Sequence, residues 1–390
     1  MKNSTTISKI MQELINEEKV KKIAEKYNYE EKARKATVSA VLQYHLCGAI
    51  EKCSSYRELE VYGAKHSGLK LDYSTLSKKS KEIPYEISLE LLESSMKESN
   101  RSKRRKLSKE YNLFVRNFDT TRFIAKRKSW NWTPYKGGKN GIKVHVSYQP
   151  ESGLPDRFCI GKIHVGDTSR LEDFCKDGDD ASCVLADRGY FNIAKFCRLD
   201  DSGQDFVIRI RNTANLVNPV PYEFTANSRY TDILCTLGED RGIPAEYRNH
   251  QFRVISFEGS NGKPVTLCTN IYSLTADEIA DLYRMRWQVE TFFKTLKQNF
   301  SLGKIFGSTM NAVFTQIIIN FIAYIMLFVA FSLANFNFSF ITFLRYIRCD
   351  SLSFPLVFCT FCTPCVYSTP MVFVRNFDYA FTVGCAERII

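Results

Sequence analysis

The spacing of apolar positions divides the chain into parts with different secondary structure. In residues 1–100 the apolar positions recur at helical spacing, which predicts a set of short helices. From Tyr111 the spacing changes to two, as expected for strands, in NLFVRNFD, GIKVHVSYQ and RFCIGKIHVGD. The segments ASCVLADRGY, FNIAKFCRL and DFVIRIR then predict a strand, a helix and a strand. Residues 111–325 are therefore expected to form an α/β domain with a mixed sheet, after a helical domain at 1–100.

A β-rich segment interrupts the α/β order at about residues 212–272. It contains short alternating stretches and the sequence SNGK, which is typical of a hairpin turn. We expect this segment to be an insertion. The chain then enters a long helix through Thr275-Ala-Asp-Glu278, in which the Thr and the Glu three residues later form a capping box.

The last part of the chain is strongly apolar. The run Ala312–Phe336 is long enough to span a membrane, so a basic membrane-associated protein is one alternative. Gln316 and Asn320 lie four residues apart on one helical face, as in a buried helix that bonds to its own domain, and we favour a core helix. No Lys follows Lys304, and residues 326–390 form an apolar, Cys-rich tail of uncertain integrity, since a frameshifted or truncated terminus would look the same.

Thirteen cysteines are scattered along the chain without the spacing of a disulfide framework, and the N-terminus has no signal-peptide core. A reducing cytoplasm is therefore expected. Cys359, Cys362 and Cys365 form a CxxCxxC run, but no fourth ligand follows at a matching spacing, so we disfavour a metal site there.

The net charge of +12 and the pI of about 9.0 favour polyanionic partners, with nucleic acid before an anionic membrane surface. A basic run from Arg101 to Lys109 falls in a linker that we expect at 101–110. The stretch LKLDYSTLSKKSKEI has the Ser, Thr and Lys residues expected where a helix meets a phosphate backbone. A solvated helical surface would have the same composition, so both interpretations stay open.

Three acids stand where strands or a helix would direct them to a common point. Asp119 follows the strand NLFVRNF, Asp187 follows the strand ASCVLA, and Glu290 lies in the long helix. A single Asp after a strand is usually a turn or cap residue. Three acids in one α/β region suit two Mg²⁺ ions, because Mg²⁺ prefers oxygen ligands and leaves positions for water and phosphate. Such a pair of ions activates a nucleophile and stabilises the leaving oxygen in phosphodiester chemistry.

The long helix adds phosphate-binding chemistry to the acids. At about 100° per residue, Tyr283, Arg286, Glu290 and Lys297 fall within an arc of about 60°, beside an apolar arc. Arg and Lys grip phosphates, Tyr donates to them or stacks, and Glu on the same face reaches the metals. The simpler alternative is an amphipathic helix with charge pairs four residues apart.

These residues resemble a known family. Tyr283, Arg286, Glu290 and Lys297 match the Y-two-R-three-E-six-K signature of the DDE transposases named after bacterial insertion sequence 4. FDTTRF, GIKVHV and LADRGYF are similar to that family as well, in its order, and the resemblance covers roughly residues 110–325.

The resemblance implies an RNase H-like catalytic fold with a β-rich insertion, and Asp119, Asp187 and Glu290 as ligands of two Mg²⁺ ions, with Mn²⁺ as a substitute. It implies hydrolytic cleavage at the transposon ends and attack of the freed 3′-hydroxyl on target DNA. A hairpin intermediate and a homodimer that pairs the two ends are known in such enzymes. A bacterial cytoplasm, in association with the nucleoid, is the implied location. The candidate DNA-binding residues are Tyr283, Arg286, Lys294 and Lys297 on the helix, with Lys143 and His145 on the strand after the first acid as secondary candidates.

Two features depart from the family's pattern. Some members flip a base onto a Trp in the insertion, whereas Trp130, Trp132 and Trp287 all lie outside residues 212–272. Tyr222, Phe224 or Phe252 are the candidate substitutes. The second departure is the tail. It keeps one further alternative open, a decayed transposase that binds DNA without catalysis.

Overall fold

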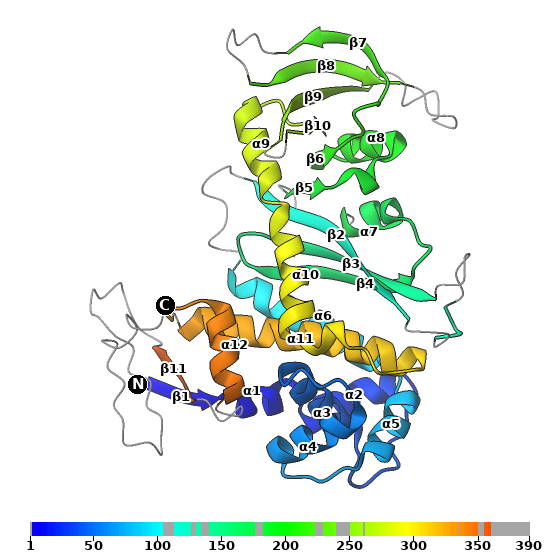
Figure 1. Cartoon of the computed structure of the whole chain (residues 1–390), viewed down its shortest axis with the longest axis vertical. Helices are drawn as coiled ribbons and strands as arrows, with labels where there is room; N and C mark the ends of the chain where they lie inside the picture. The colour runs from blue at the N-terminus through cyan, green and yellow to red at the C-terminus, as the bar shows by residue number, and fades with distance from the viewer. Residues whose placement is uncertain are drawn as a thin grey trace. The chain divides into compact units, whose positions relative to one another are not determined.

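The computed structural model describes residues 2–103, 113–125, 130–133, 140–175, 182–222, 229–238, 250–259, 262–334, 336–349 and 355–359. The chain forms two compact units (Figure 1). Unit 1 combines Met1–Ser95 with Thr295–Ile390, and unit 2 is Met96–Lys294. The C-terminal helices therefore fold with the N-terminal residues, a division that differs from the domain boundaries expected from composition.

Unit 2 is built on a mixed sheet of nine strands in the order β4-β3-β2-β5-β6-β10-β9-β8-β7. Strand β2 pairs in parallel with β5, and β5 in parallel with β6, while the other neighbours are antiparallel. This confirms the predicted mixed sheet. The strands are β2 (Phe114–Ile124), β3 (Gly141–Gln149), β4 (Leu154–Lys162), β5 (Ser182–Ala186), β6 (Asp205–Arg209), β7 (Leu216–Pro221), β8 (Thr231–Leu237), β9 (Gln251–Glu258) and β10 (Pro264–Thr269).

The predicted β-rich insertion corresponds to β7–β10 and continues the same sheet beyond β6. The hairpin between β9 and β10 is closed by Gly259 N–H donating to Lys263 O at 2.9 Å. Gly262 in this turn has φ of +70°, a conformation that favours glycine. The insertion is therefore an extension of the same sheet, joined to β6 through its pairing with β10.

Helices cover both faces of the unit 2 sheet. On one face, Phe118, Val184 and Phe206 of the strands form an apolar core with Phe174 and Phe196 of the helices. On the other face, Val115, Leu185 and Val207 pack against Leu282 and Tyr283. The helices of this unit are η2 (Asp167–Arg170), α7 (Leu171–Cys175), η3 (Arg188–Tyr190), α8 (Ile193–Asp201), α9 (Ala276–Arg284) and α10 (Trp287–Asn299), the last of which continues into unit 1.

The single long helix expected after Thr275 is wrong, because it is two helices with a break at Met285 and Arg286. The capping box at its start is confirmed: Thr275 Oγ1 accepts from the Glu278 N–H, and Glu278 Oε2 accepts from the Thr275 N–H at 2.7 Å. The break contains neither Pro nor Gly, the residues whose backbone properties most often interrupt a helix.

Unit 1 is helical, as predicted for the N-terminal region. The most buried helix is α3, a short apolar helix that packs against α4, α5 and the long C-terminal helix α11. The elements are β1 (Lys2–Thr6), α1 (Ile7–Leu14), α2 (Glu17–Lys26), α3 (Val38–Ile50), α4 (Tyr56–Ser67), α5 (Tyr73–Glu82), α6 (Tyr85–Lys103), η5 (Ser301–Gly303), α11 (Met310–Ala334), α12 (Phe340–Cys349) and β11 (Pro355–Cys359), with β1 and β11 paired antiparallel. Helix α6 runs past Ser95 into unit 2, and most of the linker expected at 101–110 lies outside the described residues.

Helix α11 passes a length and composition test for a membrane span, but most of it is buried within unit 1. Gln316 Oε1 accepts from the Phe306 N–H at 3.1 Å, and its Nε2 donates to Lys304 O at 3.1 Å. Asn320 Nδ2 donates to Gln316 O at 2.7 Å and to Ser301 Oγ at 3.1 Å. Both polar side chains therefore bond within unit 1, which confirms the predicted core helix.

Candidate active site

Asp119 lies inside strand β2 and does not follow it, so its expected position at a strand end is wrong. The strand continues to Ile124 because β3 pairs with it along the whole stretch from Asn117 to Ile124. The parallel partner β5 stops earlier, with Phe118 opposite Ala186 as the last pair. Asp119 and Asp187 therefore directly follow this last pair, on two adjacent parallel strands.

Asp187 follows β5 as predicted and caps the short helix η3. Its Oδ1 accepts from the Gly189 N–H at 2.9 Å. Asp187 is therefore also a cap residue, the usual role of a single Asp after a strand. A Cβ at Gly189 would lie 3.0 Å from Asp187 Oδ1 and 3.2 Å from Asp167 Oδ2. A larger residue at this position would therefore crowd these two carboxylates.

Asp167 is an acid that the sequence analysis missed. Its Oδ1 accepts from Lys143 Nζ at 2.9 Å, and the other carboxylate oxygen faces Gly189. The available signal was its position after the alternating segment RFCIGKIHVGD. That signal is weak, because a single Asp after a strand is usually a turn residue.

Glu290 is bonded to a buried arginine on its own helix. Its Oε1 accepts from Arg286 Nη2 at 2.7 Å, and the side chain of Glu290 is 41% exposed against 8% for Arg286. The Arg286 guanidinium lies 5.7 Å from the Tyr283 ring centre and 5.2 Å from that of Trp287. A plain amphipathic helix would also have ion pairs between residues four apart, as Arg286 and Glu290 are. Here, however, the arginine of the pair is buried.

The charges of these residues act on one another. The pKa of Asp119 is raised to about 7: burial is the main cause and the negative charges of Asp187 and Glu290 add to it, while the Thr120 N–H and Arg286 oppose the shift. The pKa of Tyr190 is also raised, first by burial and then by Asp119, Asp167 and Asp187. The structure thus brings the three predicted acids and Arg286 within electrostatic range in unit 2.

The donor set suits a hard divalent cation, because it consists of carboxylates whose mutual repulsion a cation would relieve. Among the described residues no three His, Cys, Asp or Glu side chains are already grouped as a metal site. The hydrogen bond from Arg286 occupies one oxygen of Glu290 in this conformation. The residues fit a metal by type and by charge, although their carboxylates do not converge on one point in this conformation.

The secondary candidates Lys143 and His145 lie on the opposite face of the sheet from Asp119. His145 pairs with Thr120 across the β2–β3 ladder, so the two share the face that Asp119 does not. His145 is buried, neither ring nitrogen has a hydrogen-bond partner among the described residues, and burial lowers its pKa to about 4. The structure does not bring this histidine to the acids. It favours the simple interpretation as a buried strand residue.

The other DNA-binding candidates differ in exposure. Tyr283 is buried and burial raises its pKa, whereas Lys294 and Lys297 are exposed on α10, Lys297 in the part that belongs to unit 1. Of the residues considered as substitutes for a base-stacking Trp, Phe252 is fully buried in the core, which rules it out in this conformation. The Tyr222 ring stacks on Arg253 at 4.4 Å, and Phe224 lies outside the described residues.

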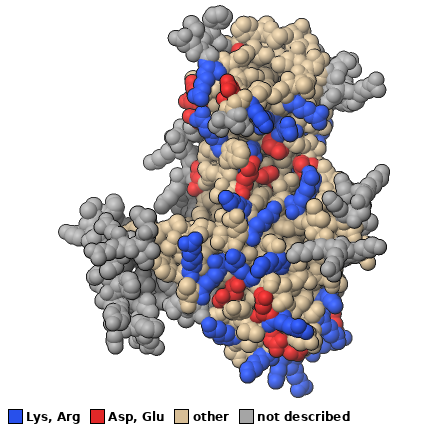
Figure 2. All heavy atoms as spheres, viewed as in Figure 1, with Lys and Arg blue, Asp and Glu red and all other residues tan. Residues whose placement is uncertain are grey.

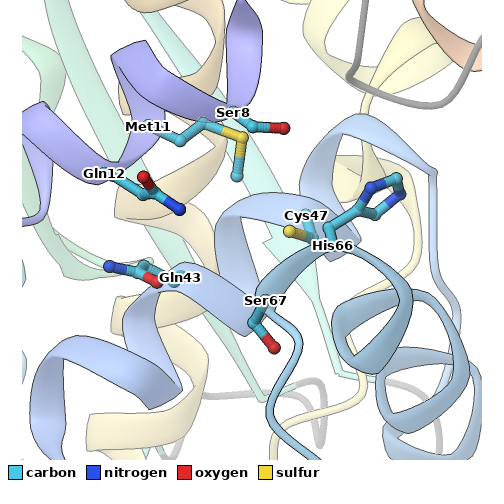
Figure 3. Close-up of a pocket in the computed structure, with 7 residues that line it drawn as sticks. All are labelled: Ser8, Met11, Gln12, Gln43, Cys47, His66 and Ser67. Atoms are coloured by element: carbon cyan, nitrogen blue, oxygen red, sulfur yellow. The ribbon is translucent and has the colours of Figure 1, made fainter.

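A small pocket in unit 1 is lined by none of the candidate catalytic or DNA-binding residues (Figure 3). Cys47, His66 and Gln43 are among its lining residues. Burial raises the pKa of Cys47 to about 12, so its thiol stays protonated and unreactive. Near the pocket, His66 Nε2 is 3.3 Å from Glu51 Oε1 in a buried contact. We assign no chemistry to this pocket.

Comparison with known proteins decides the family. Residues 114–326 match the family model described as transposase DDE domain. A probable transposase for insertion sequence element IS5377 from Geobacillus stearothermophilus is 32% identical over 356 residues, which are 88% of this chain and 91% of that protein. This chain belongs to the DDE transposases.

Further relatives have the same description. A putative transposase for insertion sequence element IS4SA from Synechocystis is 25% identical over 262 residues, covering 67% of this chain and 72% of that protein. Among solved structures, a piggyBac transposase synaptic complex with hairpin DNA aligns at a TM-score of 0.47 and 12% identity, over 91% of this chain and 83% of that one. As a DDE transposase, the chain is an enzyme that acts on DNA and depends on divalent metal ions.

Proposed function

We propose that this transposase cleaves the ends of its insertion sequence and joins the freed 3′-hydroxyls to target DNA at Asp119, Asp187 and Glu290. The observation that carries the proposal is the strand register, which makes Asp119 and Asp187 neighbours at the end of the β2–β5 pairing. The helix with Glu290 packs on the same face, since Tyr148 of β3 contacts Phe292 at 5.0 Å between ring centres. Two Mg²⁺ ions, replaceable by Mn²⁺, would be held by the three carboxylates and would supply nucleophile activation and leaving-group stabilisation.

The finer family assignment rests on the helix and the sheet. Tyr283, Arg286, Glu290 and Lys297 support membership in the insertion sequence 4 family. The order β4-β3-β2-β5-β6, with an antiparallel hairpin pair beside parallel strands, supports an RNase H-like core extended by β10, β9, β8 and β7.

Arg286 is suited to binding the scissile phosphate. Its guanidinium lies near the Tyr283 and Trp287 rings, and its Nη2 donates to Glu290 Oε1. Its buried Nε–H has no hydrogen-bond partner among the described residues, which leaves a donor for a phosphate oxygen. A planar, fixed guanidinium orients a phosphate better than a flexible ammonium does.

Helices α4 and α5 are the best candidates for DNA contact in unit 1. Gly68, at φ +69°, ends α4, and Asp72 caps α5 by accepting from the N–H groups of Ser74 and Thr75. Two helices joined by a short glycine-containing turn are a common arrangement for DNA binding. Helix α5 buries Leu76 and Ser80 and exposes Tyr73, Ser74, Lys78 and Lys81. Lys and Arg side chains also gather over the helices at the lower end of the view in Figure 2.

Pairing of two transposon ends calls for two active sites, so we propose a homodimer in the DNA complex. The test is the mass of the complex formed with duplexes that carry one element end. Two chains per two duplexes are expected, and one chain per duplex at saturation would contradict the dimer.

A joining assay tests the proposed function. The full chain is incubated with Mg²⁺, a supercoiled target plasmid and labelled duplexes made from the DNA that flanks its gene on both sides. Labelled strands covalently joined to the plasmid through their 3′ ends are the expected product. Specific binding of the flanking DNA without cleavage or joining, in Mg²⁺ and in Mn²⁺, would instead show a decayed transposase.

A further inference from the structure

The break between α9 and α10 coincides with a hydrogen bond from a distant strand. Asn117 Nδ2 of β2 donates to Met285 O at 2.7 Å, across 168 residues of sequence. The N–H groups of Met285 and Arg286 bond three residues back, to Leu282 O and Tyr283 O. The Val289 N–H, which would bond Met285 O in a regular helix, bonds Arg286 O at 3.3 Å.

The amide of Asn117 accounts for this break. Sharp changes in a helix without Pro or Gly arise where a side chain inserts into the hydrogen-bond ladder. Met285 O accepts from Asn117 and from the Gln288 N–H at 3.1 Å, which uses both lone pairs of the carbonyl. Asn117 thus bonds the carbonyl whose regular helical partner, the Val289 N–H, bonds Arg286 O instead.

Asn117 itself lies on a central strand of the sheet. It is fully buried and lies in the middle of the sheet, opposite Tyr148 on β3 and Leu185 on β5. Asn117 and Asp119 are two residues apart on one strand, so their side chains share the face that α9 and α10 cover. The hydrogen bond therefore ties the strand that carries the first acid to the point from which the helix of the third acid starts.

We propose that Asn117 is a positioning residue that fixes the α9–α10 break and thereby sets where Arg286 and Glu290 stand relative to Asp119. Apolar packing such as the contact of Tyr148 with Phe292 holds α10 against the sheet but is not directional. The hydrogen bond fixes a single register, and Arg286 and Glu290 follow within the next turn and a half of chain. The catalytic part of this inference rests on the proposed function; the structural part does not.

The test compares Asn117→Ala and Asn117→Asp with Val254→Ala in the full chain. Asn117→Asp keeps the shape and removes the donor. Val254→Ala removes buried volume from strand β9, in the core on the face of the sheet opposite α9 and α10, and serves as the control for loss of stability alone. Thermal unfolding establishes that each variant is folded at the assay temperature.

The first measurement needs no catalysis. The protein is labelled with 5-fluorotryptophan, and the ¹⁹F resonance of Trp287, at the start of α10, is assigned by its loss in Trp287→Phe. Both Asn117 variants are expected to shift or broaden the Trp287 resonance and to leave those of Trp130 and Trp132 in place. The Val254→Ala spectrum is expected to match the wild type. An unchanged Trp287 resonance in both Asn117 variants would overturn the role of Asn117 in the break.

The second measurement is the metal concentration that gives half-maximal cleavage of element-end DNA. Displacing a group that orients metal ligands costs about 10- to 100-fold in metal affinity or activity. Both Asn117 variants are therefore expected to raise the half-saturating Mg²⁺ concentration at least about tenfold, and Val254→Ala to leave it unchanged. Half-saturation at the wild-type concentration in both variants would refute the positioning role. If the wild-type chain does not cleave, the proposed function fails, and the ¹⁹F spectra still decide the structural part.

Discussion

At the residue scale, Asp119 is the group whose ionisation the fold alters most clearly among the proposed catalytic acids. Burial raises its pKa to about 7, with the charges of Asp187 and Glu290 adding to the shift. The fold thus places the Asp119 side chain where its ionised form is unfavourable. Such a cost is typical of a site prepared for a cation, because the cation removes the penalty when it binds.

This shift predicts how stability depends on pH without metal. Since the folded pKa of Asp119 is above the ordinary value of 3.8, the folded chain binds more protons than the unfolded chain between these pH values. Its contribution to stability is therefore neutral below pH about 4 and falls as the pH rises to about 7. Asp119→Asn removes this loss, so the variant is expected to gain up to a few kcal/mol over the wild type at pH 8 and nothing at pH 4.

Urea unfolding in EDTA at pH 4 to 8 measures this difference. The control is Glu25→Gln, which neutralises an exposed acid of α2 in unit 1. A stability difference between Asp119→Asn and the wild type that does not change with pH would contradict the shifted pKa.

At the scale of elements, local patterns predicted what local interactions determine. The strands of unit 2, the capping box at Thr275 and the burial of α11 followed from periodicity, cap residues and two polar positions. The break at Met285 could not be predicted, because its cause is Asn117, 168 residues away. The placement of Asp119 inside β2 likewise depends on pairing with β3, and strand alternation against that partner decides that His145 faces away from Asp119.

Helix α11 provides a test that separates a core helix from a membrane span. Gln316→Leu would favour a membrane helix, because it removes a polar group from hydrocarbon. In the observed core it leaves the Phe306 N–H and Lys304 O without their partner, and a loss of about 1–3 kcal/mol in the free energy of unfolding is expected.

The matched control on the same helix is Thr315→Val. Thr315 is buried and its hydroxyl has no hydrogen-bond partner among the described residues, so the exchange is expected to be nearly neutral. Urea unfolding of purified protein gives both values. A Gln316→Leu variant as stable as the wild type would argue against the core helix.

At the scale of the whole molecule, the C-terminal helices complete the unit that begins the chain. Arg348 Nε on α12 donates to Ile50 O at the end of α3 at 2.8 Å, and α11 packs on α3 and α5. The chain is therefore integrated into the fold at least to Cys349. Of the tail expected at 326–390, residues 360–390 lie outside the described part. The Cys362 and Cys365 positions of the CxxCxxC run lie there too.

The excess of positive charge predicts strong salt dependence of DNA binding. If α5 contacts the phosphate backbone, replacing Lys78 or Lys81 by Ala is expected to reduce the slope of log affinity against log salt by about 1 each. Lys21→Ala and Lys22→Ala, at exposed positions of α2, are the matched controls and are expected to leave the slope unchanged. An equal reduction of the slope in the α2 variants and the α5 variants would show that DNA binding depends on total charge and not on α5.

The central claim is that Asp119, Asp187 and Glu290 together form one catalytic site. Its most direct test is single-turnover cleavage of element-end DNA by Asp119→Asn, Asp187→Asn and Glu290→Gln, each with its DNA affinity measured in parallel. Each change is expected to slow cleavage by at least about a hundredfold, the scale of removing one preorganised electrostatic group, while DNA affinity stays within a few-fold of the wild type. Cleavage at the wild-type rate by any one of the three variants would contradict the assignment.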